Sequence, residues 1–545
     1  MSFWSTIAYK IKEVIHKMIG ARTIEQTLKV TPTISSQMEE AIQLWTDMYK
    51  NKAPWLKEPS YADPTRIVSL GLPALIASEK ARTALIEFNS EITTPTTDEE
   101  IENPDYVEPV PNEQGIIPPA TQPKTITKKT PISSTERAEF LNEQYKKLKK
   151  KLRTQVEYGI AKGGLIIKPY VIKNTTEEGQ QVSYSIEFDF CQADCFYPLA
   201  FNSSGQITEA AFLETSVSKD LIYRRLEYHK FENNKVTIVN KAYKSTNNSV
   251  NSDMTGVDLG QEVPLTEVPQ WRDIQPEVEI GNVTKPLFSY FKMPEANTID
   301  TTSPLGVSGY SRAVDLIKDA DIQYSTLLWE YEGGALAIDV DRNALDFIEN
   351  GKDGGSVMTN LQRRLYRKVD INIDGSTYNP YAPALRDTNY LQGLNAILMR
   401  IEDAVAISRG TLSDAGSEAK TATELKILKQ RSYQANADIQ AALQDAIEDA
   451  IYAANALCSL YKITPEGKYE VSYEWDDSII VDVDTELSKR ITLMQQGLSS
   501  KVETRMWYFG ETEDQAKQAL AKIQEESMQN MENQIFLNQE MGGNF

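Results

Sequence analysis

The chain has 545 residues, 41% of them hydrophobic and 25% charged, a composition that allows about three or four soluble domains with buried cores. Its 57 Lys and Arg residues against 78 Asp and Glu residues give a formal net charge of −21, which argues against a protein that grips nucleic acid over its whole surface. Three cysteines are too few for a disulfide framework and indicate a reducing compartment, and no apolar run is long enough to span a membrane.

The N-terminal section is expected to be helical. Residues 1–20 space their apolar side chains as a helix does but interrupt them with lysines, unlike a secretory signal peptide. Docking of this segment on the protein itself or on a neighbour is favoured over docking on a membrane surface. Apolar residues that repeat every three or four positions from Met38 to Tyr49 predict one helix. A second helix is predicted from Leu72 through Phe88, with a proline in its first turn.

Prolines, threonines and acidic residues alternate from residue 91 to residue 134, a composition that cannot bury enough apolar surface to offset the entropy of ordering. We expect an extended or mobile surface loop in this segment. Ser133 and Glu136 are spaced as a capping box and predict the start of the next helix. That helix carries the densest basic cluster, residues 146–153, for which a solvated helix face is favoured over a patch for nucleic acid or an acidic partner.

Residues 165–245 alternate apolar and polar side chains over several stretches, which is the pattern of half-buried strands. The segments Asn202–Gly205 and Glu232–Lys235 are spaced as hairpin turns between such strands. The sequence therefore predicts a small, mostly antiparallel β region between helical sections, within an α+β fold that is mainly helical.

After the β region the chain is predicted to be strongly helical. A helix of roughly 24 residues is expected to end at Gly333 and Gly334, before a mixed segment with short strands. A second helix is predicted to end near Gly410, and a third of about 40 residues follows a short polar loop. The third helix is too long for one compact domain to cover, and its many alanines favour close packing against helices of neighbouring subunits. One more amphipathic helix is expected from Glu513 to Glu526.

No motif of a known chemistry is complete. The glycine-rich run Gly351–Ser356 lacks the Gly-Lys-Ser/Thr ending of a phosphate-binding loop. The run Asp370–Gly375 begins like a calcium-binding loop, but Tyr381 stands where a bidentate Glu is required, which favours a strand that ends in an Asp-Gly turn. Cys191 and Cys195 have no histidine near them in the sequence, so two ordinary thiols are favoured over a zinc site.

Pairs of acidic residues could hold metal ions for phosphodiester cleavage, but no histidine or lysine keeps a fixed spacing around them. The chain has two histidines, and neither adjoins a candidate serine or cysteine nucleophile. The sequence therefore predicts no catalytic residue, no metal ligand and no cofactor. The acidic pairs are Asp339 and Asp341, Asp476 and Asp477, and Asp482 and Asp484.

Three sequence strings stand out beside the order of the predicted elements. They are Leu-Gly-Leu-Pro-Ala-Leu-Ile-Ala-Ser-Glu-Lys-Ala-Arg at residues 70–82, Asn-Thr-Ile-Asp-Thr-Thr-Ser-Pro-Leu-Gly at residues 297–306, and Gly-Leu-Ser-Ser-Lys-Val-Glu at residues 497–503. Together with the order helix, mixed insert, helix, polar loop and longer helix between residues 309 and 461, they resemble the portal proteins of long-tailed bacteriophages that infect Gram-positive bacteria. The resemblance covers nearly the whole chain.

The resemblance implies a portal fold with wing, stem, clip and crown regions that assembles as a ring. Each region is bounded by the predicted helices, strands or loops of this sequence that match it. The implied regions are the N-terminal wing (1–308), a stem helix (309–334), the clip (335–387), a second stem helix (388–410), the tunnel loop (411–422), a long wing helix (423–462), wing strands and a return (463–506), and a short C-terminal crown (507–545).

The family also implies a function. A homo-oligomeric ring, usually of twelve subunits, would occupy one capsid vertex and form the channel for genome packaging and ejection of double-stranded DNA. Its partners would be further copies of itself, the major capsid and scaffold proteins, the terminase motor and then head-completion and tail adaptors. Its location would be the virion, and the host cytoplasm during assembly, with no membrane partner and no enzymatic activity.

Two groups of residues are the candidate sites that this resemblance implies. A small, polar tunnel loop would line the narrowest part of the channel, where Lys420 could reach a phosphate or pair with Glu424. Clip cations would meet an acidic motor surface or pair across subunits, unless they form a solvated face. The tunnel-loop residues are Thr411, Leu412, Ser413, Asp414, Ala415, Gly416, Ser417, Glu418, Ala419 and Lys420, and the clip residues are Arg342, Arg363, Arg364, Arg367, Lys368 and Arg386.

Two other interpretations remain open from the sequence. One is a structural or scaffold-binding capsid protein without a channel, and the other is a metal-dependent nuclease that acts on phage DNA. A closed ring with an open axis would separate the conduit from the first, and insensitivity to chelation would argue against the second. An acidic channel would fit the conduit, because it repels phosphates and lets DNA slide, although salt screens that repulsion beyond about 8 Å.

Overall fold

Helices and strands are interspersed along the chain, which confirms the predicted α+β class. The structure, a computed structural model, describes residues 27–28, 33–59, 65–86, 88–102, 106, 125–175, 182–218, 221–245, 259–334, 337–341, 366–369, 378–381, 383–414, 422–475, 483–513 and 515–524. The chain divides into two units, Met1–Trp475 and Asp476–Phe545. The helix predicted for residues 1–20 lies outside the described residues.

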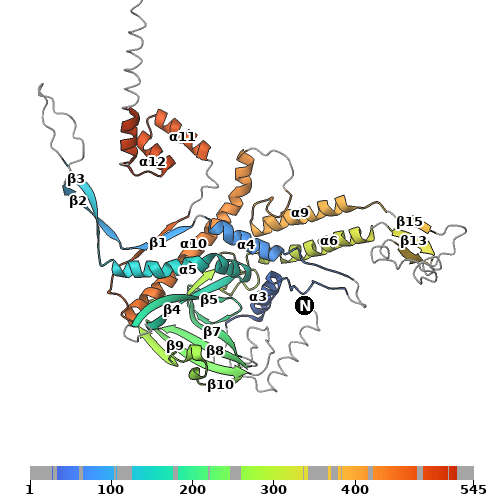
Figure 1. The fold of residues 1–545 in the computed structure, drawn as a ribbon, viewed down its shortest axis with the longest axis horizontal. Coiled ribbons are helices and arrows are strands. Elements are labelled where there is room, and N and C mark those ends of the chain that lie inside the picture. The colour runs from blue at the N-terminus through green and yellow to red at the C-terminus, as the bar shows by residue number, and fades with distance from the viewer. Residues whose placement is uncertain are drawn as a thin grey trace, which may run out of the picture. The chain divides into compact units, whose positions relative to one another are not determined.

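Two antiparallel sheets occupy the first unit where the sequence predicts a β region (Figure 1). One has the strand order β10-β9-β8-β7-β6, with β11 also paired to β9, and the other has the order β12-β4-β5. Both predicted turns are confirmed, and Asn233 and Asn234 take φ angles of 53° and 58° in a hairpin that needs positive φ at both central residues. The strands are β4 (Gly164–Thr175), β5 (Val182–Gln192), β6 (Phe196–Phe201), β7 (Ile207–Ser218), β8 (Leu221–Glu232), β9 (Lys235–Ser245), β10 (Gln261–Val263), β11 (Glu277–Gly281) and β12 (Ser289–Lys292).

Helices α3 (Ser36–Tyr49) and α4 (Leu72–Ala84) confirm the two N-terminal predictions. Pro73 lies in the first turn of α4, where a missing N–H leaves no hydrogen bond unmade. Helix α4 ends at Ala84, earlier than predicted, and Phe88 lies outside the helix. The Phe88 ring stacks on Trp475, with ring centroids 4.3 Å apart.

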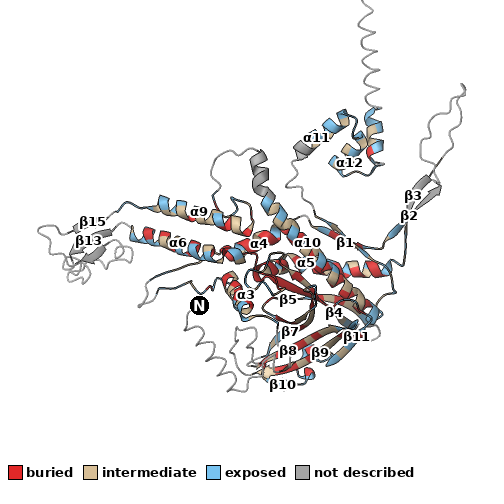
Figure 2. Ribbon diagram, turned by 180° about the vertical axis from the view of Figure 1, so that it is seen from behind, coloured by how far each residue is buried: buried red, intermediate tan, exposed pale blue. Residues whose placement is uncertain are grey.

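Two long helices, α5 (Glu136–Lys162) and α10 (Ala422–Leu460), pack on the β12-β4-β5 sheet. The predicted length of α10 is confirmed at 39 residues, but its partners differ from the prediction. From Ile439 onward its apolar face is buried against β4, β12, α4 and α5 of the same chain (Figure 2). The alanines in this half bring the helix close to its own sheet, so the expected packing against neighbouring subunits is wrong for residues 439–458.

The segment from residue 91 to residue 134, predicted to be a loop, carries strands at both ends. Strand β1 pairs antiparallel with β16, and β2 pairs with β3 in a two-stranded ribbon. The register sets Asp98 opposite Lys129 and Glu99 opposite Lys128, so residues of opposite charge occupy facing positions of the ribbon. The middle of the segment lies outside the described residues. The strands are β1 (Asn89–Thr93), β2 (Thr96–Glu102), β3 (Thr125–Pro131) and β16 (Glu470–Glu474).

Much of the basic cluster on α5 is neutralised within the chain. Three of its cations form ion pairs with carboxylates on α5 itself or on β5, and Arg153 also donates to the backbone oxygen of Ser78. These contacts favour a helix face over a patch for nucleic acid. The ion pairs are Lys146–Glu143, Lys147–Glu187 and Arg153–Glu157, at 2.7, 2.8 and 3.0 Å.

Helices α6 (Val314–Gly333) and α9 (Asp387–Val405) lie side by side in both ribbon views and confirm two further predictions (Figures 1 and 2). The chain between them contributes a small sheet of order β14-β13-β15, where short strands were expected. Helix α9 ends five residues before the predicted Gly410, because Ala406 takes a left-handed conformation at its C-cap. The strands are β13 (Ala337–Asp341), β14 (Tyr366–Val369) and β15 (Tyr378–Tyr381).

The second unit is helical in its described residues. Helix α11 (Val483–Gln495) and helix α12 (Lys501–Phe509) stand where the prediction placed wing strands and a return. Ser500 and Glu503 form a capping box at the start of α12, which the sequence analysis did not identify. Residues 515–524 are also helical, in agreement with the expected C-terminal helix.

The start of α5 is joined to the end of α10 by contacts that replace the predicted capping box. Thr135 is the N-cap residue, and the Ser133 hydroxyl accepts a hydrogen bond from the backbone N–H of Lys468. Arg137, which is 1% exposed, donates five hydrogen bonds around the last turn of α10 and the loop after it. A cation is favourable there, because the C-terminal carbonyls of a helix carry partial negative charge. Its acceptors are Pro465 O, Asn455 O, Asn455 Oδ1, Ser459 Oγ and Thr464 O.

We expect the substitution Arg137→Ala to lower the free energy of unfolding by about 2–4 kcal/mol, because it leaves buried carbonyls without donors and opens a cavity. Denaturant unfolding followed by tryptophan fluorescence measures this change. The control is Arg82→Ala on α4, where the side chain is 58% exposed and pairs with Glu79 at the surface, so little change is expected. Equal effects of the two substitutions would contradict the assignment of Arg137 as a buried clamp.

A buried charge cluster joins the two sheets. Glu227 on β8 receives hydrogen bonds from Lys168 Nζ on β4 (2.7 Å) and from His229 Nε2 (2.6 Å). Burial alone would raise the pKa of Glu227, but Lys168, His229 and Arg225 hold that pKa well below its ordinary value. Burial lowers the pKa of His229, whose ring lies edge-on to Phe212. The folded protein therefore keeps this imidazole neutral.

The pKa of His229 predicts a loss of stability in mild acid. Below about pH 6.5 the unfolded chain binds a proton at this histidine more readily than the folded chain does, so stability falls as the pH falls. Glu227 adds a further loss only below about pH 4.5. Urea midpoints measured at pH 7.5, 6.0 and 5.0 should decline in the wild type and decline less in His229→Gln. An identical slope in the two proteins would contradict the assignment.

Candidate functional site

The structure describes part of each predicted site. Of the tunnel-loop residues, 411–414 are described and 415–420 lie outside the described residues. Of the clip cations, Arg342, Arg363 and Arg364 also lie outside them, and only the backbone of Arg367 and Lys368 is described, in β14. Arg386 is described with its side chain. The candidate site is therefore the α6–α9 helix pair with the chain segments at its ends.

Asp321 on α6 holds the segment that leads into α4. Its Oδ1 accepts a hydrogen bond from Leu70 N–H at 2.8 Å, and its Oδ2 accepts one from Trp55 Nε1 at 2.9 Å. One turn further along α6, Ser325 Oγ accepts from Val68 N–H at 3.0 Å. Burial raises the pKa of Asp321, because the carboxylate is removed from water. These contacts fasten the α3–α4 connection to the side of α6.

Glu330 near the end of α6 binds Arg386, the residue before α9. The Glu330 carboxylate accepts from Arg386 N–H and Nε at 3.1 Å and from Nη2 at 2.7 Å. The guanidinium lowers the pKa of Glu330 through these hydrogen bonds. The Arg386 side chain remains 62% exposed. This predicted clip cation therefore links the end of α6 to the start of α9 and also faces solvent.

Glu402 on α9 is fully buried and binds the chain that follows the helix. Its Oε1 accepts from the backbone N–H groups of Gly410 (3.1 Å), Leu412 (2.6 Å) and Ser413 (2.9 Å). Its Oε2 accepts from the Ser413 hydroxyl at 2.7 Å. Converging N–H groups of this kind form an anion-binding concavity, which the chain fills with its own carboxylate.

Asn395 makes the second contact to this segment. Its Oδ1 accepts from Asp414 N–H at 2.7 Å, and its Nδ2 donates to Asp414 O at 3.3 Å. Next to Glu402, Asp403 forms an ion pair with Arg409 at 2.7 Å, and both side chains are more than 40% exposed. The structure thus gives the described part of the predicted tunnel loop a defined course along α9.

The sequence analysis missed Glu402, although the sequence held a signal for it. Glu402 lies at helical spacing from the apolar residues Leu398 and Val405, so it falls on the buried face of α9. An acid on a buried face needs donors, and these could be sought in the polar loop that follows. The role of Arg386 as the partner of Glu330 had no such signal, because the two lie 56 residues apart in the sequence.

The structure offers little for metal or thiol chemistry. Within the described residues no group of three or more His, Cys, Asp or Glu side chains could hold a metal ion. Burial raises the pKa of Cys191 to about 12, whereas zinc ligands are thiolates. Asp339 and Asp341 lie in β13, and Asp476, Asp477 and Asp482 fall outside the described chain.

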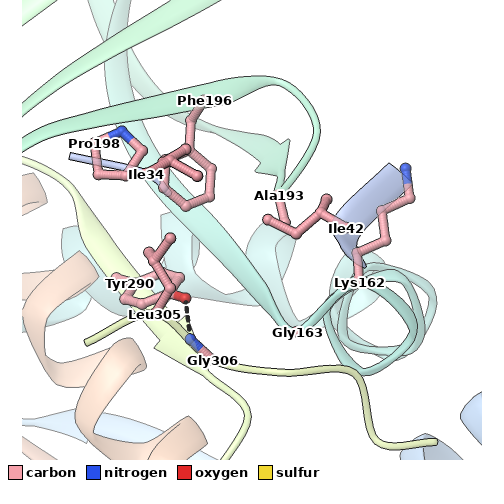
Figure 3. Close-up of a pocket in the computed structure, with 10 residues that line it drawn as sticks. All are labelled: Ile34, Ile42, Lys162, Gly163, Ala193, Phe196, Pro198, Tyr290, Leu305 and Gly306. Carbon is pink, nitrogen blue, oxygen red and sulfur yellow. Dashed lines mark hydrogen bonds between the residues drawn. The ribbon is translucent and has the colours of Figure 1, made fainter. Parts of the chain in front are cut away.

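One small pocket lies beside the β12-β4-β5 sheet (Figure 3). It has room for about one water molecule, and the hydrogen bond from Gly306 N–H to Tyr290 Oη crosses its edge. It therefore does not suit a substrate or cofactor. Its lining residues are Ile34, Ile42, Lys162, Gly163, Ala193, Phe196, Pro198, Tyr290, Leu305 and Gly306.

Comparisons with known proteins point to one family. The family model described as "Phage portal protein, SPP1 Gp6-like" matches residues 36–533. The match begins at α3, includes α6, α9 and the segment that Glu402 binds, and extends into the second unit. No curated protein matches the chain. No helix in the described ranges is long and apolar enough to cross a membrane.

We expect Arg386→Gln to speed amide hydrogen exchange severalfold over residues 386–390, because the substitution removes the side-chain contacts to Glu330 at the start of α9. Global stability should change little, since the arginine is largely exposed. The matched control is Arg400→Gln, an exposed arginine further along α9. Unchanged exchange in Arg386→Gln would show that this pair does not hold the helix start.

Proposed function

Because the chain belongs to the SPP1 Gp6-like phage portal protein family, we propose that it forms a homo-oligomeric ring at one vertex of the phage capsid. The ring is the channel through which double-stranded DNA enters the head during packaging and leaves it on ejection. The observation that carries this proposal is the family match over residues 36–533. The role is structural and not enzymatic.

The finer assignments follow from the order of elements. We assign α6 and α9 to the stem, the small sheet between them to the clip, and residues 411–422 to the tunnel loop. Residues 1–308 and 423–506 are the wing, and residues 507–545 are the crown. Support comes from the side-by-side packing of α6 and α9 and from the small sheet that the intervening chain forms. Twelve subunits is the number we propose.

The proposed partners are those that a portal ring meets in turn. Scaffold and major capsid proteins surround it during assembly in the host cytoplasm, the terminase docks on its clip, and head-completion and tail adaptors replace the motor afterwards. Clip arginines and Lys368 would meet an acidic surface of the motor or adaptor. Arg386 contributes less to that surface than the sequence suggests, because it already pairs with Glu330.

Charge supports passage of DNA in preference to its retention. The formal net charge of −21 per chain gives an assembled ring a strong acidic excess, which repels phosphates at short range. Among the proposed tunnel-loop residues, Lys420 is the one cation in the sequence that could contact a passing phosphate. Its contact would be brief, because a single cation adds little to the affinity for a moving duplex.

We predict that Lys420→Ala lowers the amount of DNA packaged per head severalfold and leaves ring assembly intact. Packaging is measured as nuclease-protected DNA, and assembly by electron microscopy with native mass spectrometry. Lys146→Ala is the control, because that lysine is exposed on α5 and pairs with an exposed glutamate. Normal packaging in Lys420→Ala would remove this residue from the mechanism. Closed particles without an axial opening would instead favour a capsid protein that has no channel.

A further inference from the structure

The polar segment after α9 is bound to that helix at several points, and Glu402 supplies most of them. In addition to its carboxylate contacts, its backbone oxygen accepts hydrogen bonds from the N–H groups of Ala406 and Ile407. The described residues provide no ion pair to Glu402; the nearby Arg409 pairs with Asp403. Every donor to its carboxylate is a backbone N–H or hydroxyl of residues 410–413.

This arrangement couples the carboxylate to one conformation of the segment. A buried carboxylate without donors is strongly unfavourable, so the folded state must keep the N–H groups of residues 410, 412 and 413 pointed at Glu402. The segment in turn has unsatisfied N–H groups unless the carboxylate is present. The Glu402 carboxylate and the backbone of residues 410–413 therefore hold each other in place.

Asn395 extends the anchor back along the helix. It lies seven residues before Glu402, a separation of about 10 Å along an α-helix axis. The chain turns at Ala406, which has a φ angle of 56°. Asn395 binds both the N–H and the carbonyl of Asp414, so the residues after the turn run back along α9. The two anchors hold residues 410–414 beside α9.

We infer that Glu402 and Asn395 are positioning residues that set the place and direction from which the tunnel loop leaves the stem. The functional part of this inference rests on the proposed portal function, and the structural part does not. The anchored segment, residues 406–414, gives the loop a rigid base. Without it, ring assembly persists but residues 411–414 no longer keep their course along α9, and packaging falls.

The structural part is tested by amide hydrogen exchange in the assembled full-length protein. In Glu402→Ala the amides of residues 410, 412 and 413 should exchange at least about tenfold faster than in the wild type, because they lose a charged acceptor. Glu402→Gln should have a smaller effect, since its Oε1 still accepts the backbone N–H groups and Ser413 Oγ can accept from its amide. Arg400→Ala, at an exposed position on α9 two residues before Glu402, is the matched control and should leave these amides unchanged.

Should Glu402→Ala fail to fold, Asn395→Ala tests the second anchor, with faster exchange expected at the Asp414 amide. Wild-type exchange rates in these two variants would overturn the anchor, whatever the function of the protein.

The functional part is tested by packaging. Heads assembled with Glu402→Ala or Asn395→Ala should hold severalfold less nuclease-protected DNA, and Glu402→Gln should restore most of the loss. Faster exchange with normal packaging would overturn the positioning role while leaving the anchor in place. If wild-type protein forms no ring that packages DNA, the proposed function fails, and the exchange experiment still decides whether the anchor exists.

Discussion

Carboxylates buried on a helix must receive hydrogen bonds, and on α6 and α9 these come from chain segments outside the two helices. Asp321 binds the segment before α4, Glu330 binds Arg386 at the start of α9, and Glu402 binds the segment after α9. Each acid would be unfavourable if its segment moved away. The helix pair and its connections are therefore held as one arrangement, on which the proposed stem, clip and tunnel loop all depend.

The rest of the first unit supplies a base for this helix pair. Helices α5 and α10 cover the β12-β4-β5 sheet. Arg137 joins the start of α5 to the end of α10, and here the buried charge is a cation that donates hydrogen bonds to carbonyl oxygens. Buried residues, drawn red in Figure 2, are concentrated in this region and most are apolar, whereas α6 and α9 have many exposed positions. The first unit thus has two parts: a well-packed body, and the helices α6 and α9, whose ends are held by polar contacts.

The sequence predicted what depends on local periodicity. Apolar spacing gave the helices α3, α4, α5, α6, α9 and α10, and the Asn-Asn turn marked a hairpin whose positive φ angles asparagine tolerates. The sequence did not predict features that depend on contacts between residues far apart in the chain. The Ser133 hydroxyl binds the backbone N–H of Lys468, β2 pairs with the distant β3, and α10 packs on the sheet of its own chain. For the site, the resemblance implies a tunnel loop at residues 411–420, which stays a prediction, whereas Glu402 and the Arg386–Glu330 pair became visible only once the helices were placed.

A cryo-electron microscopy map of the assembled full-length protein decides whether α6, α9 and the segment that Glu402 binds line a channel. We expect a closed ring with an open axial channel, with α6 and α9 along its wall and residues 411–414 next to its narrowest point, held by Glu402. A ring in which these residues face the outer rim would contradict the assignment of stem and loop. A particle with no axial opening would contradict the conduit itself.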